Sequence, residues 1–350
     1  MSVQKDVFLV LGGDSFVGGH VVQRLKARGD NVSIFDLVDR QYAVPFYQGD
    51  ICSKDEVLSA IRKSGATCVI HTISPLSIYH QDELHVFEQV IVQGTKNAID
   101  AALTAGVQKL VYHSSSSVVF DGSDIVDGDE TLPYAKNFRS IYSKTRMLAE
   151  KAVLGANGQG GLHTAVIRPV ATFGVGDRES IPGSYNSWKT GRTHVQLGSE
   201  NKLFDRTYVS NIALGLVLAA DHLPAPSVAG EVFFITNGAS GRLPFWDFAR
   251  AIWREMDAAF PGRTPPAKKR VVIPRWAALV IAHVSLWMAW LRGTQATLTP
   301  YTVSLVTAQL TFSDAKARRV LGYEPEVEVE EGLEMTMKWF KNEVDAGRFE

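Results

Sequence analysis

The sequence has few cysteines, no excess of charge of either sign and no apolar run as long as a membrane span. Cys52 and Cys68 are its only cysteines, which excludes a disulfide framework and the cysteine spacing of a zinc site, and fits a reducing compartment. Its 36 basic and 37 acidic residues give a formal net charge of -1, so no basic surface for nucleic acid is expected. We therefore expect no nucleic-acid partner.

The sequence also lacks an internal repeat, a low-complexity tract and a signal-peptide pattern. Its first residues, MSVQKDVFLVLGG, run directly into an apolar strand pattern, and we expect the catalytic body in the cytosol or facing it. With 350 residues, of which 45% are hydrophobic, the chain is long enough to bury a large core in one domain or two.

Short apolar runs alternate with helical patterns through the first half of the chain. This alternation predicts an α/β fold, a Rossmann-type doubly wound parallel sheet. The runs typical of buried strands are DVFLVLGG, NVSIFDL, TCVIHTI, KLVYHSSSS and LHTAVIRPV. We assign residues 1–175 to a dinucleotide-binding domain and 176–350 to a smaller, partly interleaved substrate-binding region, with returning Rossmann elements at about 203–240.

A glycine-rich turn, VLGGDSFVGGHVV, follows the first strand and opens the first helix. Gly12, Gly13 and Gly18 leave room for backbone N–H groups and the helix N-terminus to face a dinucleotide pyrophosphate. Ser15 occupies the place of the middle glycine of a GxxGxxG pattern. The turn alone is also compatible with a plain strand-to-helix connection, but its position in a βαβ unit favours a nucleotide.

Two carboxylates follow the next strands. Asp36 ends the second strand, where an acidic residue binds the hydroxyls of the adenosine ribose and repels a 2′-phosphate. This favours NAD over NADP, although Arg40 lies close by in the sequence and weakens the exclusion. Asp50, in the GDI after the third apolar run, is a candidate to accept from the adenine amino group. Either carboxylate is also compatible with a solvated loop.

The stretch YSKTR contains a candidate proton-transfer pair. On a helix Tyr142 and Arg146 share a face, whereas Lys144 points about 200° away from Tyr142. A tyrosine, with an ordinary pKa of about 10, needs a nearby cation to act as a base near neutral pH. Arginine supplies that charge and can bond a ribose, but it does not pass on a proton. The alternative is an exposed helical pair, with the serines of HSSSSVVF only capping a strand.

The chain resembles the extended short-chain dehydrogenases of the 3β-hydroxysteroid dehydrogenase branch, and within it the fungal sterol-4α-carboxylate 3-dehydrogenases (decarboxylating). The resemblance covers nearly the whole chain and rests on LVYHSSSSVVFDGSDIVDGDETLPY, VIRPVATFGVGDRESIPG, ENKLFDRTYVSNIALGLVLAA and GEVFFITNGA. It implies NAD-dependent oxidation of the 3β-hydroxyl of a 4α-carboxysterol or related terpenoid to a 3-ketone, with loss of CO2. Two alternatives stay open. One is an isomerase-like dehydrogenase or ketoreductase acting on another polycyclic terpenoid, and the other is a cofactor-binding paralogue with a non-redox role.

The resemblance also implies the roles of single residues. It makes Tyr142 the catalytic base, Ser115 the serine that positions the substrate, and Arg146 the occupant of the family's lysine position. The residues that it places against the cofactor are Gly12, Gly13, Ser15, Phe16, Val17, Gly18, Asp36, Asp50, Ile51, Tyr142, Arg146 and Pro169. Taken with the sequence patterns, the expected partners are NAD, with NADP less favoured, an apolar polycyclic substrate, a membrane surface and a second copy of the chain. No metal is implied.

Three residues depart from the family pattern. Ser15 replaces a glycine of the phosphate turn, Arg146 replaces lysine, and Ile91 stands where NVxGT has asparagine. We interpret the changes at Arg146 and Ile91 as linked. An asparagine that helps a lysine to relay protons loses its role when arginine replaces the lysine. This linkage favours a divergent paralogue.

The segment VVIPRWAALVIAHVSLWMAWLRG raises the question of a membrane. Residues 276–291 carry no charge, lie between basic residues and are too few for a span, which needs about 20 apolar residues. Trp287 and Trp290 on one helical face fit a membrane interface, and a cytosol-facing, peripheral location at the endoplasmic reticulum membrane is the expectation. A buried helix that lines an apolar substrate pocket fits the same pattern. We expect His283 to be structural.

Overall fold

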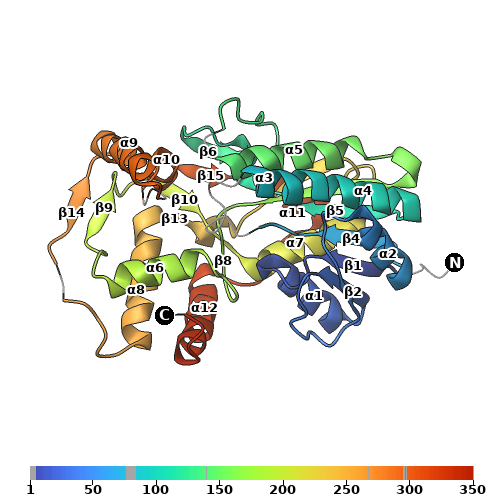
Figure 1. The fold of residues 1–350 in the computed structure, drawn as a ribbon, viewed down its shortest axis with the longest axis horizontal. Coiled ribbons are helices and arrows are strands. Elements are labelled where there is room, and N and C mark those ends of the chain that lie inside the picture. Colours follow the sequence, from blue (N-terminus) through green and yellow to red (C-terminus); the bar gives the residue numbers. More distant parts are fainter. Residues whose placement is uncertain are drawn as a thin grey trace.

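The computed structural model describes residues 5–75, 84–138, 140–266, 268–294, 296 and 298–349. Its centre is a parallel sheet of seven strands with helices on both faces (Figure 1). In spatial order the strands are β12 (Glu231–Ile235), β7 (His163–Pro169), β5 (Lys109–His113), β4 (Cys68–His71), β1 (Val7–Leu11), β2 (Asn31–Asp36) and β3 (Phe46–Gln48). The sheet confirms the predicted Rossmann-type doubly wound fold.

The strands are apolar throughout because both faces of the sheet are buried. Phe8 and Val10 of β1 point into one core, while Leu9 and Leu11 point into the other. Helices α1 (Phe16–Arg28) and α7 (Val209–His222) pack side by side over the first core. Helices α2 (Lys54–Ser64), α4 (Gly94–Ala105) and α5 (Ile141–Gly155) cover the second.

The second half of the chain returns to the sheet. After β8 (Thr172–Phe173) the chain leaves the sheet through α6 (Ser180–Lys189) and β9 (Val195–Leu197). It comes back where β11 (Thr207–Tyr208) pairs with β8, and β12 then pairs with β7 at the edge of the sheet. Within the segment 203–240, β11, α7 and β12 therefore belong with the first half, whereas β10 (Leu203–Asp205) joins a separate sheet.

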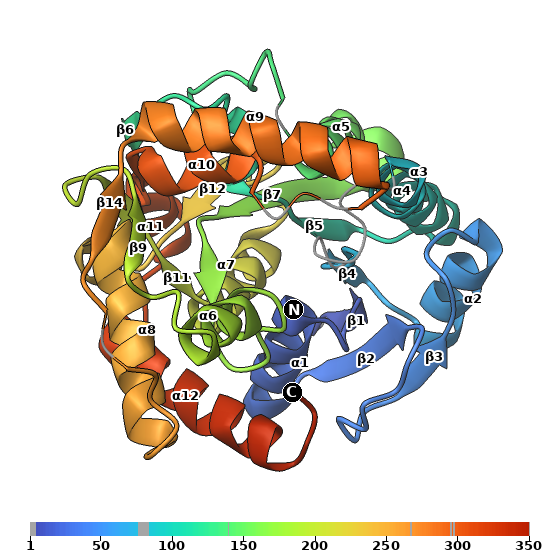
Figure 2. The same cartoon turned by 60° about the vertical axis from the view of Figure 1, so that its left-hand side comes forward.

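The remaining elements form the second region. A four-stranded sheet has the order β13 (Arg242–Pro244), β10, β15 (Leu310–Phe312) and β6 (Ile125–Gly128), and β14 (Val271–Ile273) pairs with β9. The helices are α8 (Phe245–Ala259), α9 (Arg275–Arg292), α10 (Pro300–Thr307), α11 (Ala315–Leu321) and α12 (Val329–Asp345). Short helical turns are α3 (Leu84–Phe87), η1 (Glu88–Gln93), η2 (Ser116–Val119), η3 (Gln159–Gly161) and η4 (Gly238–Gly241). Figure 2 shows α9 and α12 on opposite sides of the molecule.

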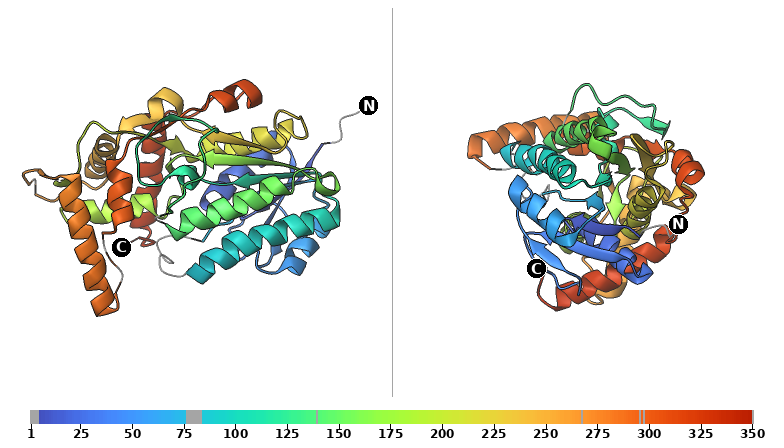
Figure 3. Two further views of the ribbon diagram at one scale, coloured as in Figure 1. Left: turned by 90° about the horizontal axis from the view of Figure 1, so that it is seen from above. Right: turned by 90° about the vertical axis from the view of Figure 1, so that its right-hand side faces the viewer.

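Helix α9 exposes its large apolar side chains. Trp276, Trp287 and Trp290 are 71%, 61% and 76% exposed, and Figure 3 shows α9, in orange, projecting at the outer edge of the fold. The buried residues of α9 are small, namely Ala278, Ala282 and Ala289. The interpretation of this segment as a buried helix is therefore wrong, because its buried side chains are alanines and its tryptophans are exposed. Within the described ranges, no helix is both long enough and apolar enough to span a membrane.

Candidate active site

The glycine turn between β1 and α1 adopts a backbone conformation that leaves no room for a side chain at Gly12 or Gly18. Gly12 has a φ of +85°, and a Cβ at Gly18 would lie only 1.9 Å from the carbonyl oxygen of Gly12. Ser15 is the N-cap of α1, because its Oγ accepts the N–H of Gly18 at 3.1 Å. The serine hydroxyl thus accepts a hydrogen bond from one of the helix N–H groups that would otherwise face a phosphate.

The next two residues of the turn differ in what they present. Val17 is buried in the core beneath the sheet, so only its backbone faces the turn. Phe16 is half-buried, and a Cβ at Gly176 would lie 3.3 Å from its ring. The loop that follows β8 therefore packs against the start of α1.

Two acidic residues, Asp36 at the end of β2 and Asp14 within this turn, lie close together. Asp36 Oδ2 accepts the N–H of Asp14 at 3.0 Å, and its Oδ1 accepts the N–H of Leu37 at 2.7 Å. Burial raises the pKa of Asp36 above its ordinary value, against the opposite effect of these N–H groups. Asp14 is 5% exposed, its Oδ2 accepts the N–H of Arg40 at 3.1 Å, and its Oδ1 has no partner in the described structure.

Asp14 is a site residue that our sequence reasoning missed. An acidic residue inside a phosphate-binding turn is the signal that could have found it. Burial, followed by the charge of Asp36, raises the pKa of Asp14, while the Arg40 N–H lowers it. Two acidic groups therefore stand where the adenosine ribose is expected.

Asp50 and Ile51 follow β3 and start the turn into α2. Asp50 is exposed, and its Oδ1 accepts the N–H of Cys52 at 2.9 Å. Ile51 is buried, and its carbonyl oxygen accepts from the amide of Asn97 at 3.0 Å. The side chain of Asp50 is thus accessible to a ligand, whereas Ile51 anchors the turn to α4.

Helix α5 carries Tyr142 and Arg146 on one face. The Cζ of Arg146 lies 5.3 Å from the ring centre of Tyr142, which is half-buried. Arg146 is fully buried, whereas Lys144 is exposed. The structure therefore brings arginine, not the nearby lysine, against the tyrosine.

Arg146 is held from β5. Its Nη1 donates to Tyr112 Oη at 3.0 Å and to the carbonyl oxygen of His113 at 2.8 Å. Its Nε and Nη2 are buried and have no partner among the described residues. Burial lowers the pKa of Arg146, but the phenols of Tyr112 and Tyr142 outweigh it and raise the pKa above its ordinary value. The guanidinium is a fixed positive charge with two unused N–H-bearing nitrogens.

Two neighbouring histidines are neutral. Burial, aided by the charge of Arg146, lowers the pKa of His71 to about 3 and that of His113 well below its usual range. The Nε2 of His71 is bonded to Thr95 Oγ1 at 3.0 Å, while neither ring nitrogen of His113 has a partner in the described ranges. Arg146 therefore supplies the positive charge beside Tyr142.

Ser115 follows β5 at the carboxyl edge of the sheet. Its Oγ accepts the N–H of Ser117 at 3.2 Å, which makes it the N-cap of η2. Ser115 and Ser116 are both half-buried, whereas Ser114 is fully buried and donates its hydroxyl to Glu150. The first serine of the run is thus occupied, and Ser115 remains available.

Glu150 ties together the three elements that carry the site. It lies on α5 and accepts from Ser114 after β5, from Tyr134 Oη at 2.9 Å and from Arg168 Nε at 3.1 Å. Arg168 and Glu150 are both buried, and Arg168 directly precedes Pro169, the last residue of β7. Glu150 was also missed. Its spacing of four and eight residues from Arg146 and Tyr142 is the signal, because such residues share a helical face.

Ile91 lies in a helical irregularity. The chain forms a π-helical turn, η1, at Glu88–Gln93, directly before α4, and Ile91 is 1% exposed within it. Such turns are frequently found at functional sites. The π-helical turn is therefore present although Ile91, the residue at the family's asparagine position, is apolar.

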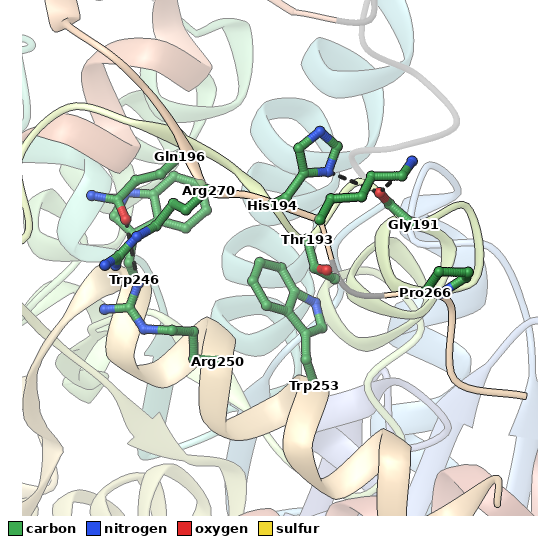
Figure 4. A pocket seen from close by; sticks show the side chains of 10 residues that line it. Gly191, Thr193, His194, Gln196, Trp246, Arg250, Trp253, Pro266 and Arg270 are labelled. Carbon is green, nitrogen blue, oxygen red and sulfur yellow. Dashed lines mark hydrogen bonds between the residues drawn. The ribbon is translucent and has the colours of Figure 1, made fainter. Parts of the chain in front are cut away.

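A separate cavity of about 230 Å³ lies in the second region. Figure 4 shows Trp246, Arg250 and Trp253 of α8 facing His194 and Arg270. It contains none of the predicted site residues, so it is not part of the arrangement around Tyr142.

Comparison with known proteins identifies the family. The model of the 3-beta hydroxysteroid dehydrogenase/isomerase family matches residues 9–266. The chain belongs to this family. Sterol-4-alpha-carboxylate 3-dehydrogenase, decarboxylating, of Saccharomyces cerevisiae is 36% identical over 95% of this chain and 97% of its own length. The Homo sapiens protein of the same description is 34% identical over 95% of this chain and 88% of its own length.

A solved structure shows the same fold. A short-chain dehydrogenase/reductase superfamily protein from Agrobacterium tumefaciens with bound NAD has a TM-score of 0.69 at 20% identity, covering 98% of this chain and 99% of that one. As a member of the 3-beta hydroxysteroid dehydrogenase/isomerase family, the chain is an oxidoreductase that acts on a hydroxyl group with a nicotinamide cofactor. The crowded glycine turn, in which Gly18 has no space for a Cβ, fits such a dinucleotide.

Proposed function

We propose that the protein oxidises the 3β-hydroxyl of a 4α-carboxysterol or related terpenoid to a 3-ketone with NAD, and that CO2 is then lost. The observation that carries the proposal is the contact of Tyr142 with the buried Arg146 on α5, next to the strand end that bears Ser115. The near full-length likeness to sterol-4-alpha-carboxylate 3-dehydrogenases supports the substrate class.

Each catalytic residue has a distinct role in this proposal. The Tyr142 phenolate takes the proton of the 3β-hydroxyl, and Ser115 bonds the same oxygen to fix its position. Arg146 stabilises the phenolate, and its unpartnered Nε and Nη2 groups are donors for the nicotinamide ribose. A nicotinamide held by these residues would supply the acceptor for the hydride from C3.

Loss of CO2 follows from the product's own chemistry. Oxidation makes a ketone at C3, which is β to the carboxylate on C4. When the bond from C4 to the carboxyl carbon breaks, its electron pair passes into the enolate of that ketone, and C4 then takes up a proton. We therefore assign no separate decarboxylation residues.

The cofactor is NAD in our proposal. Gly12, Gly13 and Gly18 cradle the pyrophosphate, and Asp36 accepts from the adenosine ribose. Asp50 accepts from the adenine amino group. The same assignment places Ser15, Phe16, Val17, Ile51 and Pro169 along the cofactor. Asp36 and Asp14 together support NAD, because both repel a 2′-phosphate.

We further propose that α9 docks on the cytosolic surface of the endoplasmic reticulum membrane. Its exposed tryptophans suit the interface between headgroups and hydrocarbon. The exposed Lys268, Lys269 and Arg292 flank the helix and favour anionic headgroups. An apolar substrate would then be near the surface that dissolves it.

The test is to supply the purified protein with NAD and a 4α-carboxysterol and to identify the products by mass. We expect NADH and a 3-ketosterol that is lighter than the substrate by one CO2 and two hydrogens. A 3-ketone that still carries the C4 carboxylate would support the isomerase-like alternative. Turnover only of other 3β-hydroxy terpenoids would support it as well. Binding of cofactor without NADH formation from any 3β-hydroxy substrate would support a non-redox role.

A further inference from the structure

Arg206, in the connection between β10 and β11, is a cation without a polar partner. No hydrogen bond or ion pair to its guanidinium occurs within the described part of the chain, and its Nε is buried. Its Cζ lies 4.4 Å, 4.8 Å and 4.7 Å from the ring centres of Phe204, Phe245 and Phe248. Three phenyl rings therefore surround a charge that no acidic side chain offsets.

The rings hold the guanidinium without satisfying it. Aromatic faces attract a cation, but they do not replace the strong acceptors that five N–H donors require. Burial lowers the pKa of Arg206 to about 9, so the side chain still carries its charge at neutral pH. Arg206 is partly exposed, and its Nε is a buried donor without an acceptor among the described residues, an uncommon arrangement in folded proteins. The arrangement calls for an anionic ligand.

Arg206 also lies close to the carboxyl edge of the large sheet. Thr207, the next residue, donates its N–H to the carbonyl oxygen of Ala171 at 3.2 Å and its hydroxyl to that of Val170 at 2.6 Å. Val170 and Ala171 directly follow Pro169, the last residue of β7. Arg206 is thereby joined to one segment of the proposed active site.

A second connection runs through the aromatic rings. Phe204 packs in one apolar cluster with Val118 and Phe120, which follow Ser115 after β5. The ring of Phe120 contacts that of Tyr301 on α10, with 6.3 Å between their centres. Arg206 is therefore linked through Phe204 to the segment that follows Ser115, and through Thr207 to the segment that follows Pro169.

We propose that Arg206 binds the carboxylate of the substrate, an inference that rests on the function proposed above. The guanidinium fork matches the two oxygens of a carboxylate, and the phenyl rings offer a surface for a flat apolar ring system. A neutral sterol leaves the cation unpaired, so Arg206 selects the acid. Once CO2 has gone, the product lacks the anion, and its hold on the protein weakens.

The experiment compares a 4α-carboxysterol with its methyl ester, which keeps the shape and removes the charge. Binding of each to the full chain is measured by tryptophan fluorescence with NAD present. We expect the acid to bind about 10- to 100-fold more tightly than the ester. Arg206→Gln should reduce the affinity for the acid to that for the ester and leave the ester within about twofold of the parent value.

Two further variants separate charge recognition from folding. Arg206→Lys should keep part of the preference for the acid, because the charge remains. Arg263→Gln is the matched control, since Arg263 also stacks on a phenylalanine ring, Phe260 at 5.8 Å, but is exposed. It should change neither affinity.

Equal binding of acid and ester by the parent protein overturns the proposal, as does an Arg206→Gln variant that keeps the preference. Failure of both ligands to bind overturns it together with the sterol assignment. Selective binding of the acid without NADH formation contradicts only the proposed reaction.

Discussion

At the scale of single residues, the site uses a positive charge that cannot be removed. Burial lowers the pKa of Arg146, but the phenols of Tyr112 and Tyr142 raise it above its ordinary value, so Arg146 can stabilise a phenolate but cannot relay protons. The two imidazoles beside it, His71 and His113, are neutral because of burial and of that same charge. Proton release from Tyr142 must therefore use another route, such as water.

Tyr142→Phe should abolish turnover and leave the affinity for NAD within about twofold, because only the proton acceptor is lost. Lys144→Ala is the control on the same helix and should have little effect, since that side chain is exposed. Turnover is measured as NADH formation and affinity by titration. Wild-type turnover of the phenylalanine variant would show that another group is the base.

Arg146→Lys tests whether arginine is required. We expect this variant to retain or increase dehydrogenation, and Arg146→Met to lose both activity and NAD affinity. The double variant Arg146→Lys, Ile91→Asn should gain further, because the amide would stand in the existing π-helical turn beside the lysine. A double variant no better than the single one contradicts the linkage between the two positions.

Asp177 makes stability depend on pH. Burial raises its pKa from 3.8 to about 6, while the N–H groups of Glu179 and Ser180 bond its Oδ1 at 2.8 Å each. A raised carboxyl pKa stabilises the fold below about pH 4, and this contribution is lost as pH rises through 6. Asp177→Asn should therefore increase the free energy of unfolding at pH 8 by roughly 1–2 kcal/mol. The gain should vanish at pH 4 in denaturant titrations, and an equal gain at both pH values contradicts the assignment.

How far the sequence predicts these residues depends on how local their contacts are. The shared face of Tyr142 and Arg146 follows from helical spacing alone. The partners of Arg146 on β5 and the bond from Arg168 to Glu150 could not be predicted, because they join segments far apart in the chain. The same reason explains why Asp14 was missed, since its importance depends on its contacts with Asp36 and Arg40.

At the scale of elements, the first βαβ unit concentrates negative charge at the adenosine end. The turn from β1 into α1 and the end of β2 bring Asp14 and Asp36 together, and the backbone N–H of Arg40 bonds Asp14. The strands themselves were predictable, because buried parallel strands are continuous apolar runs. The surroundings of α9 were not, since a tryptophan-rich apolar segment suits a core and a membrane surface equally.

Cofactor preference tests this pair of elements. NAD should bind more tightly than NADP, and Asp36→Ala should reduce this difference in affinity. Asp14→Asn with Asp36→Ala should narrow it further, by about 10-fold or more, because the second repelling charge is removed and Arg40 is left unopposed. Dissociation constants from calorimetry check this without any turnover. Equal affinity of the parent protein for both cofactors would contradict the prediction.

At the scale of the whole molecule, apolar surface is concentrated on one side. Helix α9 lies opposite α12 (Figure 2). Most of the large apolar side chains of α9 are exposed. A contiguous apolar surface of this kind marks an interaction site in soluble proteins. The basic residues at both ends of α9 give the surface a preferred lipid charge.

Replacing Trp287 and Trp290 by serine should reduce cosedimentation with anionic liposomes by about 10- to 100-fold, because two exposed aromatic anchors are lost. The circular dichroism spectrum should not change, since both side chains are exposed. Met335→Ser on α12 removes an exposed apolar side chain from the opposite side and should leave liposome binding unchanged. Unchanged cosedimentation of the double variant would contradict docking through these tryptophans.

The return of β12 to the edge of the sheet has a consequence for how the protein is made. Pairing of β7 with β12 needs a strand that starts at Glu231, about 60 residues after β7 ends at Pro169. Packing of α1 against α7 needs a helix that starts at Val209, about 40 residues after the same point. While the ribosome adds that stretch, the backbone of β7 has an unpaired side and the apolar face beneath α7 is uncovered. A nascent chain stopped at residue 175 should therefore depend on chaperones, whereas one stopped beyond α7 and β12 should close its nucleotide-binding half unaided.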